Sequence, residues 1–266
     1  MTVDEEAMEL HRKLNGKIST EAKAKVKDRH DLSVTYTPGV AAPCRLIAKD
    51  PHEAYNYTIK GNTIAVVSDG SAVLGLGNIG PYAALPVMEG KCVLFKEFGG
   101  VNAFPIVLDT QDTEEIIKAV KAIAPGFGGI NLEDISAPRC FEIEERLKAE
   151  LDIPVFHDDQ HGTAIIVLSG IINALKVTHR TVEDTKIVVN GAGSAGVAIT
   201  KLLLRYGFKD ITMCDKTGIL SKNSKEELNW MQKKMVEETN LSGKTGTLAD
   251  ALKGADVFIG VSAPGI

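Results

Sequence analysis

Short apolar runs alternate with longer stretches of helical periodicity from about Gly61 to the end of the sequence. Such runs are typical of strands buried on both faces of a parallel sheet, and the longer stretches are typical of the crossover helices that join them. We expect strands at residues 63–69, 91–95, 103–109, 129–134, 153–156, 186–190, 211–215 and 256–261. Expected helices lie at 113–124, 138–152 and 162–176, the last of them long and buried. The pattern predicts an α/β fold.

Two consecutive domains are expected, because a second series of strands and helices begins after the apolar stretch 162–176. We place the boundary near residue 160, so that residues 1–160 form the first domain and residues 161–266 the second. A short amphipathic helix is predicted at the start from four apolar residues at helical spacing, Val3, Ala7, Leu10 and Leu14. Gly16 is expected to end it.

Composition and charge exclude several classes of function. The hydrophobic share of 44% and the charged share of 24% are those of an ordinary globular protein with a packed core. A formal net charge of -5, with both signs mixed along the chain, leaves no basic stripe for a nucleic-acid backbone. The apolar run 163–175 falls short of the roughly 20 residues that a membrane-spanning helix needs. Because the acidic start also lacks a signal-peptide layout, we expect a cytoplasmic protein that binds neither nucleic acid nor membrane.

The cysteines indicate neither a zinc site nor a disulfide framework. They lie far apart and form no CxxC pair, at Cys44, Cys92, Cys140 and Cys214. We expect reduced thiols, most of them buried.

One glycine-rich motif directly follows the predicted strand 186–190 and opens a helix-like run at 197–207. It consists of Gly191, Ala192, Gly193, Ser194, Ala195 and Gly196. In this arrangement the first glycine permits a tight turn, the second admits a pyrophosphate, and the third lets helix and strand approach. Asp215 ends the next predicted strand, where an acid binds the ribose hydroxyls of a dinucleotide. These residues predict a dinucleotide site.

A second match to the same motif, at residues 75–80, competes with the first. It is followed by Pro81 and Pro86, which leave little room for a crossover helix even though Glu97 has nearly the right spacing for the ribose acid. We therefore interpret residues 75–80 as a glycine-rich loop that shapes a substrate pocket.

Two acidic pairs follow neighbouring predicted strands. Glu133 and Asp134 close the run 129–134, and Asp158 and Asp159 follow the strand at 153–156. Parallel strands joined by one crossover helix are often neighbours, so both pairs are expected at the same carboxyl edge, where open α/β sheets bind ligands. Oxygen ligands that meet at one point suit Mg²⁺ or Mn²⁺. The alternative, that these acids cap helices or lie in solvated turns, is nearly as well supported by spacing alone.

Six segments resemble, in order, the signature segments of malic enzymes of the small bacterial and archaeal type. They are 31-DLSVTYTPGVAAPC-44, 66-VVSDGSAVLGLGNIG-80, 86-PVMEGK-91, 131-NLED-134, 157-HDDQHGTA-164 and 191-GAGSAG-196. The first and the fifth are the most specific. The resemblance implies a substrate and metal domain over residues 1–160, followed by a Rossmann-like NAD(P)-binding domain over residues 161–266.

The resemblance also implies an activity and roles for individual residues. The activity is oxidative decarboxylation of malate to pyruvate and carbon dioxide with reduction of NAD(P), and oxaloacetate decarboxylation is a candidate second activity. Position by position, it implies Tyr36 as general acid and Lys91 as general base. It implies Glu133, Asp134 and Asp159 as ligands of Mg²⁺ or Mn²⁺, with Asp158 beside them as a supporting or proton-relay carboxylate. A homodimer or larger homo-oligomer is implied as well, in which the N-terminal segment is a candidate to lend Tyr36 to a neighbouring subunit.

These roles fit the chemistry of the reaction. Loss of hydride from malate needs a base for the hydroxyl proton, and loss of the carboxylate needs positive charge beside the developing enolate. Tyr36 would then deliver a proton to the enolpyruvate carbon. Without the resemblance, Lys91 is a surface lysine before a strand and Tyr36 a turn aromatic ahead of Pro38.

The sequence departs from the wider family in two places. Large eukaryotic members have an arginine for the substrate carboxylate at a position that is Ala72 here, an absence that the small type shares. Family members also continue beyond the segment that corresponds to 261–266, so we expect the sequence to be part of a longer protein.

The cofactor and two rival functions are open at this point. Asp215 would repel a 2′-phosphate and favours NAD, but the adjacent Lys216 softens the repulsion and leaves NADP as an alternative. An amino-acid dehydrogenase also pairs a lysine with such a glycine motif, but it needs no metal and so no paired carboxylates. A non-catalytic dinucleotide-sensing or scaffold module is the other rival, and the presence of Tyr36 and Lys91 argues against it.

Overall fold

The protein is described here by a computed structural model, which covers residues 2–224 and 227–262. Its residues divide by contact into two compact units. Unit 1 contains the residues up to Ser71 together with Asn78–Leu132 and Leu147–Val155, and unit 2 contains Ala72–Gly77, Glu133–Arg146 and the chain from Phe156 onward. The chain therefore passes between the units several times, whereas the sequence suggests one boundary near residue 160. The end of the segment 261–266, from residue 263, lies outside the described residues.

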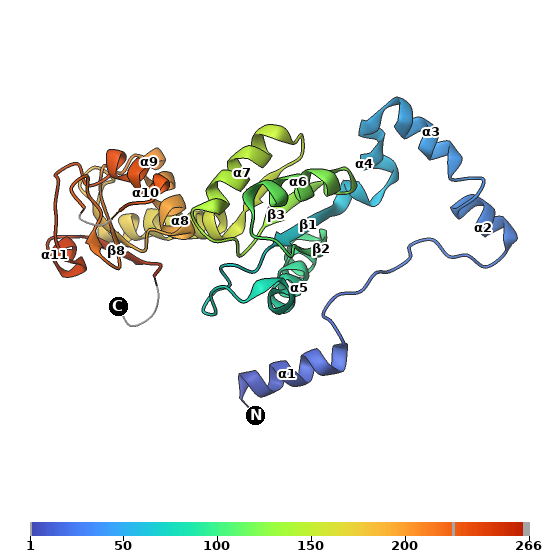
Figure 1. Ribbon diagram of the computed structural model, residues 1–266, viewed down its shortest axis with the longest axis horizontal. Helices are drawn as coiled ribbons and strands as arrows, with labels where there is room; N and C mark the ends of the chain where they lie inside the picture. The colour runs from blue at the N-terminus through green and yellow to red at the C-terminus, as the bar shows by residue number, and fades with distance from the viewer. Residues whose placement is uncertain (1, 225–226, 263–266) are drawn as a thin grey trace. The chain divides into compact units, whose positions relative to one another are not determined.

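Unit 1 begins with an N-terminal arm of short helices, drawn in blue in Figure 1. They are α1 (Val3–Leu14), α2 (Arg29–Thr35), α3 (Ala41–Lys49), η1 (Pro51–Glu53), α4 (Ala54–Tyr57) and η2 (Ile59–Asn62). The predicted first helix is confirmed as α1, which starts with a reciprocal capping box between Thr2 and Glu5. None of residues 2–62 is buried. The arm thus carries its apolar side chains without a core of its own.

A four-stranded sheet lies mainly in unit 1, and only its last strand continues into residues of unit 2. Its strands are β1 (Thr63–Ser68), β2 (Asn102–Val107), β3 (Gly129–Leu132) and β4 (Val155–His157), in the order β2-β1-β3-β4. Strand β1 pairs in parallel with both β2 and β3, and its residues Ala65, Val66 and Val67 are fully buried. The helices α6 (Thr113–Ile123) and α7 (Arg139–Glu150), with the short η3 (Ala124–Gly126), connect the later strands. The expected parallel α/β architecture, including β3 and β4 as neighbours, is confirmed.

The predicted strand at 91–95 is wrong. These residues lie inside α5 (Gly80–Gly99), a helix of 20 residues that directly follows the glycine-rich loop 75–80. Pro81 occupies the first turn, where no backbone N–H is needed, and Pro86 is accommodated within the helix. Ala84, Met88 and Cys92 recur every four residues on the buried face. A short apolar run does not distinguish a strand from a segment of buried helix, and here the helix forms.

Unit 2 contains a second four-stranded sheet, in the order β7-β6-β5-β8. Its strands are β5 (Lys186–Asn190), β6 (Asp210–Asp215), β7 (Gly218–Ile219) and β8 (Val257–Gly260). Strand β5 pairs in parallel with β6 and β8, as expected, whereas the unexpected β7 returns antiparallel to β6. The helices are α8 (Asp158–Thr178), α9 (Ser194–Tyr206), α10 (Trp230–Glu238) and α11 (Leu248–Leu252).

Helix α8 differs from its prediction in its start and in its burial. It begins at Asp158 rather than near residue 162, so Asp158 and Asp159 lie in its first turn. Its buried residues, which include Ala164 and Ile171, form one face, and α8 packs along α9. Apolar side chains elsewhere on it are exposed, Ile166 by 72%. The expectation of a buried helix is therefore met only on one face.

By length and composition alone, α8 is the one helix among the described residues that is long and apolar enough to cross a membrane. Its 21 residues exceed the length that the sequence suggested. Helices that pack within folded units pass the same test, and α8 packs against α9. The length of α8 is therefore not evidence that it crosses a membrane.

Candidate functional site

Three acidic side chains meet within unit 2. Glu133 and Asp134 follow β3 directly, and Asp159 lies in the first turn of α8, just after β4. One carboxylate oxygen from each lies within 4.8 Å of the other two. Glu133 and Asp134 are buried, whereas the Asp159 side chain is 33% exposed. The structure thus brings together the three residues that the resemblance implies as metal ligands.

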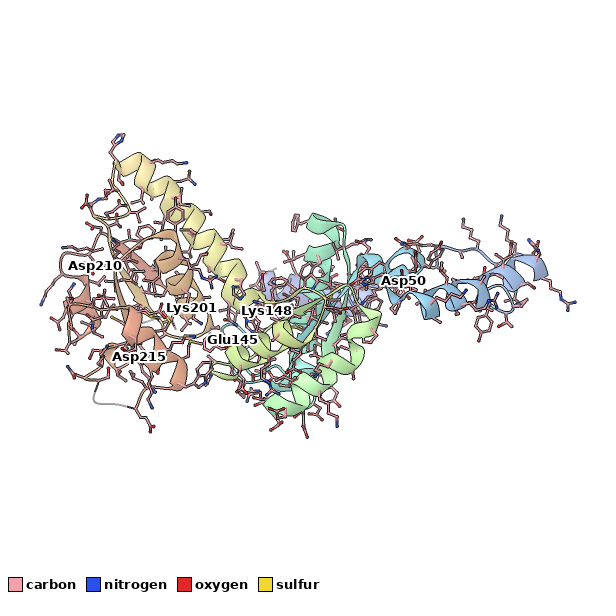
Figure 2. All side chains as sticks on the ribbon, turned by 90° about the horizontal axis from the view of Figure 1, so that it is seen from above. Asp50, Glu145, Lys148, Lys201, Asp210 and Asp215 are labelled. Carbon is pink, nitrogen blue, oxygen red and sulfur yellow. The ribbon has the colours of Figure 1, made fainter. Side chains whose placement is uncertain are left out.

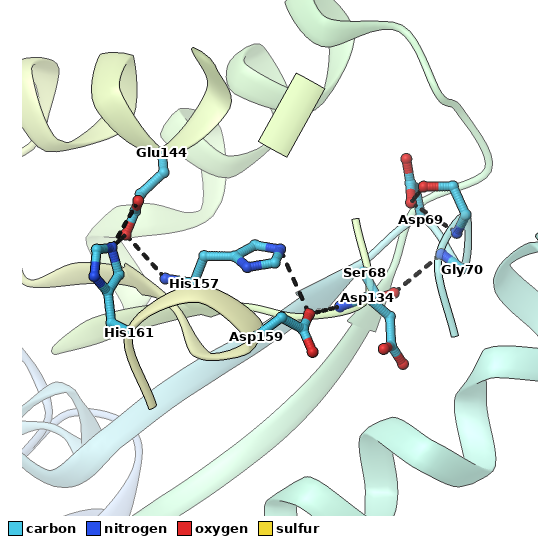
Figure 3. Close-up of polar contacts among 9 residues, drawn as sticks. Ser68, Asp69, Gly70, Asp134, Glu144, His157, Asp159 and His161 are labelled. Carbon is cyan, nitrogen blue, oxygen red and sulfur yellow. Dashed lines mark hydrogen bonds and ion pairs between the residues drawn. The ribbon is translucent and has the colours of Figure 1, made fainter. Parts of the chain in front are cut away.

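The backbone of Asp134 connects this group to two other segments. Its φ of 54° lies in the left-handed region, which few residues other than glycine adopt. Its N–H donates to Asp159 Oδ2 at 2.9 Å, and its carbonyl oxygen accepts the N–H of Ala72 at 2.9 Å. Figure 3 shows Asp134 and Asp159 side by side, joined by the first of these bonds. Both hydrogen bonds hold the unusual conformation in place.

Asp159 also lies beside a fully buried histidine. His157 Nε2 is 3.7 Å from Asp159 Oδ2, which is too long for a hydrogen bond. Neither ring nitrogen of His157 has a hydrogen-bond partner within the part of the chain that the structure describes. Burial lowers the pKa of His157, and the neighbouring Asp159 only partly opposes this effect. Burial therefore favours the neutral form of the ring.

Glu144 of α7 connects to both sides of the Asp158–Asp159 pair. Its Oε1 accepts the backbone N–H of His157 at 3.0 Å, and His161 Nε2 lies 2.8 Å from Oε1 and 2.9 Å from Oε2. Because a carboxylate only accepts, His161 donates this bond. Glu144 is itself buried, with 4% of its surface exposed.

Sequence reasoning missed Glu144, His157 and His161. A signal for Glu144 was present, since it lies four residues after Cys140 and three before Leu147, on the buried stripe of α7. A charged residue on such a stripe requires a partner. Its partners, His157 and His161, lie 13 and 17 residues further along the chain, so helical periodicity does not identify them.

Asp158 belongs to the same helix turn but not to the three-acid group. Its carboxylate lies over Gly162, one turn further along α8, because a Cβ at residue 162 would come within 2.3 Å of Asp158 Oδ1. The glycine therefore leaves the space that the Asp158 carboxylate occupies.

The glycine-rich loop of unit 2 has the expected local geometry. Gly191 has a φ of 118°, which a side chain would not tolerate, and its N–H donates to the Cys214 carbonyl at 2.8 Å. A Cβ at Gly196 would lie 1.7 Å from the Gly191 carbonyl oxygen. Only glycine therefore allows α9 to approach the turn at Gly191 this closely. Helix α9 starts at Ser194 without a side-chain cap. Its first backbone N–H groups are thus available to an anion.

Asp215 ends β6, next to the strand that leads into this loop. Its Oδ1 accepts from the backbone N–H of Thr217 at 2.8 Å and from the Thr217 hydroxyl at 2.6 Å. Its Oδ2 lies 3.4 Å from Gln232 Nε2. Figure 2 labels Asp210 and Asp215 at the two ends of this strand. The carboxylate is therefore held in one orientation before any ligand arrives.

Tyr36 and Lys91, the implied acid and base, belong to unit 1. Tyr36 follows the last turn of α2 and is 65% exposed. Lys91 lies within α5 and is partly buried, so it does not precede a strand. Both roles remain predictions.

Comparison with known proteins identifies the family. Residues 15–148 match the model of the malic enzyme N-terminal domain, and residues 160–265 match the model of the malic enzyme NAD binding domain. The chain belongs to the malic enzyme family. The resemblance and the α/β fold predicted from the sequence are thereby confirmed.

Two curated relatives and one solved structure illustrate the similarity. The NAD-dependent malic enzyme of Geobacillus stearothermophilus is 62% identical over 95% of this chain and 53% of its own length. The bifunctional malic/malolactic enzyme of Bacillus subtilis is 54% identical over 100% of this chain and 65% of its own. The crystal structure of the NAD-dependent malic enzyme of Thermotoga maritima is 54% identical with a TM-score of 0.94, over 97% of this chain and 68% of that one. The chain therefore spans between half and two thirds of these two curated family members.

The contact between Asp158 and Gly162 generates a prediction. In Gly162→Ala the new methyl group displaces the Asp158 carboxylate, so we expect malate turnover in the full-length protein to fall about tenfold. Alanine is favoured over glycine in a helix by about 1 kcal/mol, so the free energy of unfolding should fall little. Gly170→Ala is the matched control, because nothing lies within 4 Å of its Cβ position on the same helix. Equal turnover of the two variants would contradict a role for the Asp158 carboxylate.

Proposed function

We propose that the chain carries out the metal-dependent oxidative decarboxylation of malate to pyruvate and carbon dioxide, with reduction of NAD(P). The observation that supports this most is the position of the three-acid group in the same unit as the dinucleotide loop. The names of the relatives, NAD-dependent and NADP-dependent malic enzymes, agree with it. We also propose that oxaloacetate is decarboxylated at the same site.

The three acids fit a divalent cation of the Mg²⁺ or Mn²⁺ type. Two like charges about 4 Å apart repel each other by about 4 kcal/mol at an effective dielectric constant of about 20. Because two of the three carboxylates are buried, a cation is the group that would offset this repulsion. Hard oxygen donors without nitrogen or sulfur suit these cations rather than zinc. When bound, the cation would supply the positive charge that the developing enolate requires.

The remaining steps fall to side chains of the chain itself. Lys91 is proposed to take the hydroxyl proton of malate as hydride leaves, and Tyr36 to return a proton to the enolpyruvate carbon. Asp158 precedes Asp159, and its carboxylate lies over Gly162. We propose that it relays protons beside the three acids. The domain boundary near residue 160, the cytoplasmic location and the absence of nucleic-acid and membrane partners also stay predictions.

NAD is the proposed cofactor, with NADP as the alternative. Asp215 is pre-oriented by Thr217, and a fixed carboxylate at this position accepts from the ribose hydroxyls and repels a 2′-phosphate. Lys216 follows it directly and softens the repulsion.

Asp159→Asn tests the metal proposal, because it keeps the size of the side chain and removes one charge. Malate turnover should fall at least about a hundredfold, equivalent to about 2.7 kcal/mol of transition-state stabilisation. Mn²⁺ affinity and oxaloacetate decarboxylation should fall as well, while NADH affinity survives. The measurements are a Mn²⁺ titration, NADH fluorescence and both reaction rates on the full-length protein.

Asp158→Asn provides the comparison, with a smaller expected loss of Mn²⁺ affinity. Unchanged Mn²⁺ affinity and oxaloacetate decarboxylation in Asp159→Asn would remove Asp159 from the ligand set. Activity that resists a chelator would favour a metal-free dehydrogenase instead.

Asp215→Asn tests the cofactor proposal. The amide retains an oxygen for Thr217 but loses the charge, so the kcat/KM ratio of NADP to NAD should rise about tenfold. Asp210→Asn, at the opposite end of β6, is the control and should leave the ratio unchanged. A wild-type protein that prefers NADP more than tenfold would overturn the proposal.

A homodimer or larger homo-oligomer is proposed from the N-terminal arm, whose apolar residues are exposed in the single chain. Leu10 of α1 is 48% exposed, and no residue of α1 is buried. Light scattering should give a dimer or larger assembly, and Leu10→Asp should shift it toward monomer with loss of turnover. Arg12→Asp places an aspartate on the opposite face of α1, with a charge change of two units instead of one, and should still have little effect. A fully active wild-type monomer would refute the proposal.

A further inference from the structure

One buried carboxylate contacts the chain on both sides of the acidic pair at the start of α8. Glu144 accepts the N–H of His157, the residue before the pair, and the imidazole of His161, two residues after it. Figure 3 shows Glu144 above both histidines, with Asp159 on the far side of His157. The β4–α8 junction is thereby attached to α7 at two points.

We propose that Glu144 is a positioning residue that sets Asp159 in its metal-binding orientation by holding the junction from His157 to His161. The inference rests on the proposed metal function of Asp159. It assigns to Glu144 no contact with metal, substrate or cofactor.

Helix capping does not account for this arrangement. In a capping box the N-cap N–H bonds to a side chain of the same helix, as Thr2 does to Glu5 in α1, whereas the N–H of His157, the N-cap residue of α8, bonds to Glu144 of another helix. The side chain of His157 makes no cap hydrogen bond of its own. The bond to Glu144 therefore fixes the direction in which the chain leaves β4.

The burial of Glu144 carries a cost that packing would avoid. The neighbouring buried residues of α7, Cys140, Ile143 and Leu147, are apolar, and an apolar residue at 144 would extend their face. A buried carboxylate costs several kcal/mol in lost solvation, which its hydrogen bonds only partly offset. The buried carboxylate of Glu144 is therefore better explained by the local geometry that it maintains than by a gain in the stability of the fold.

The geometry in question is that of Asp159. Its Oδ2 accepts the Asp134 N–H at 2.9 Å and faces the His157 ring at 3.7 Å, so its position depends on where residues 157–161 lie. If Glu144 releases the junction, the three carboxylates no longer converge. When a residue that orients a metal ligand without binding the metal is mutated, metal affinity typically falls by tenfold to a hundredfold.

Glu144→Gln in the full-length protein tests the proposal. The substitution removes the negative charge and one of the two oxygens that face His161, while the remaining amide oxygen still accepts from the N–H of His157. Mn²⁺ affinity should fall about tenfold, or about 1.4 kcal/mol, while NADH affinity changes less than twofold. Saturating Mn²⁺ should restore most of kcat. Glu145→Gln, the same substitution at the next and exposed residue of α7, is the matched control and should change neither affinity.

A double-mutant cycle separates positioning from general stability. His161→Ala, which leaves no donor for Glu144, should weaken Mn²⁺ binding in the same direction. The double variant should bind Mn²⁺ no more weakly than the weaker-binding single variant, because both changes act on the same contact. His161 is 43% exposed in its side chain, so this variant decides the question if Glu144→Gln does not fold. Unchanged Mn²⁺ affinity in the variant that folds would overturn the inference, as would equal losses of Mn²⁺ and NADH affinity.

Asp159→Asn distinguishes this inference from the proposed function. If Asp159→Asn leaves Mn²⁺ affinity unchanged, the metal proposal fails and the inference fails with it. If Asp159→Asn loses Mn²⁺ while Glu144→Gln and His161→Ala keep it, only the inference fails.

Discussion

The hydrogen bond from the Asp134 N–H to Asp159 Oδ2 is the interaction on which the candidate site depends. It joins the end of β3 to the start of α8, and it draws together carboxylates that repel one another. The left-handed backbone of Asp134 and the bond from Ala72 to its carbonyl set the direction of that N–H. Glu144 secures the other side, since it holds the chain before and after Asp159. The acidic group is therefore a product of backbone geometry as much as of side-chain charge.

The sequence predicts the part of this arrangement that follows from topology. Residues 129–134 and 153–156 are apolar runs on either side of one helix-like stretch, and two parallel strands joined in this way bring their following residues to one edge. The fold class and the dinucleotide loop also follow from local pattern. Gly191 and Gly196 occupy positions where the structure leaves no room for a side chain.

Tertiary context decides what the sequence does not predict. Residues 91–95 are as apolar as a strand, but the burial of Ala84, Met88 and Cys92 places them in α5. Helix α8 begins at Asp158, four residues earlier than its apolar stretch, and the N–H of the residue before it bonds to Glu144 of α7. The contact between Glu144 and His161 spans 17 residues, a separation that periodicity does not register. Tyr36 and Lys91 follow from resemblance alone.

The order of these parts along the chain has an evolutionary consequence. Every acid of the cluster precedes residue 160, where the match to the NAD binding domain begins, and the cofactor loop with Asp215 follows it. An exchange of sequence after residue 160 would replace the glycine-rich loop and keep the three acids, but it would also replace His161, the partner of Glu144. Relatives named for NAD and for NADP share this chain's sequence at 62% and 48% identity. The three acids and the glycine-rich loop are thus encoded on opposite sides of residue 160, although both lie in unit 2.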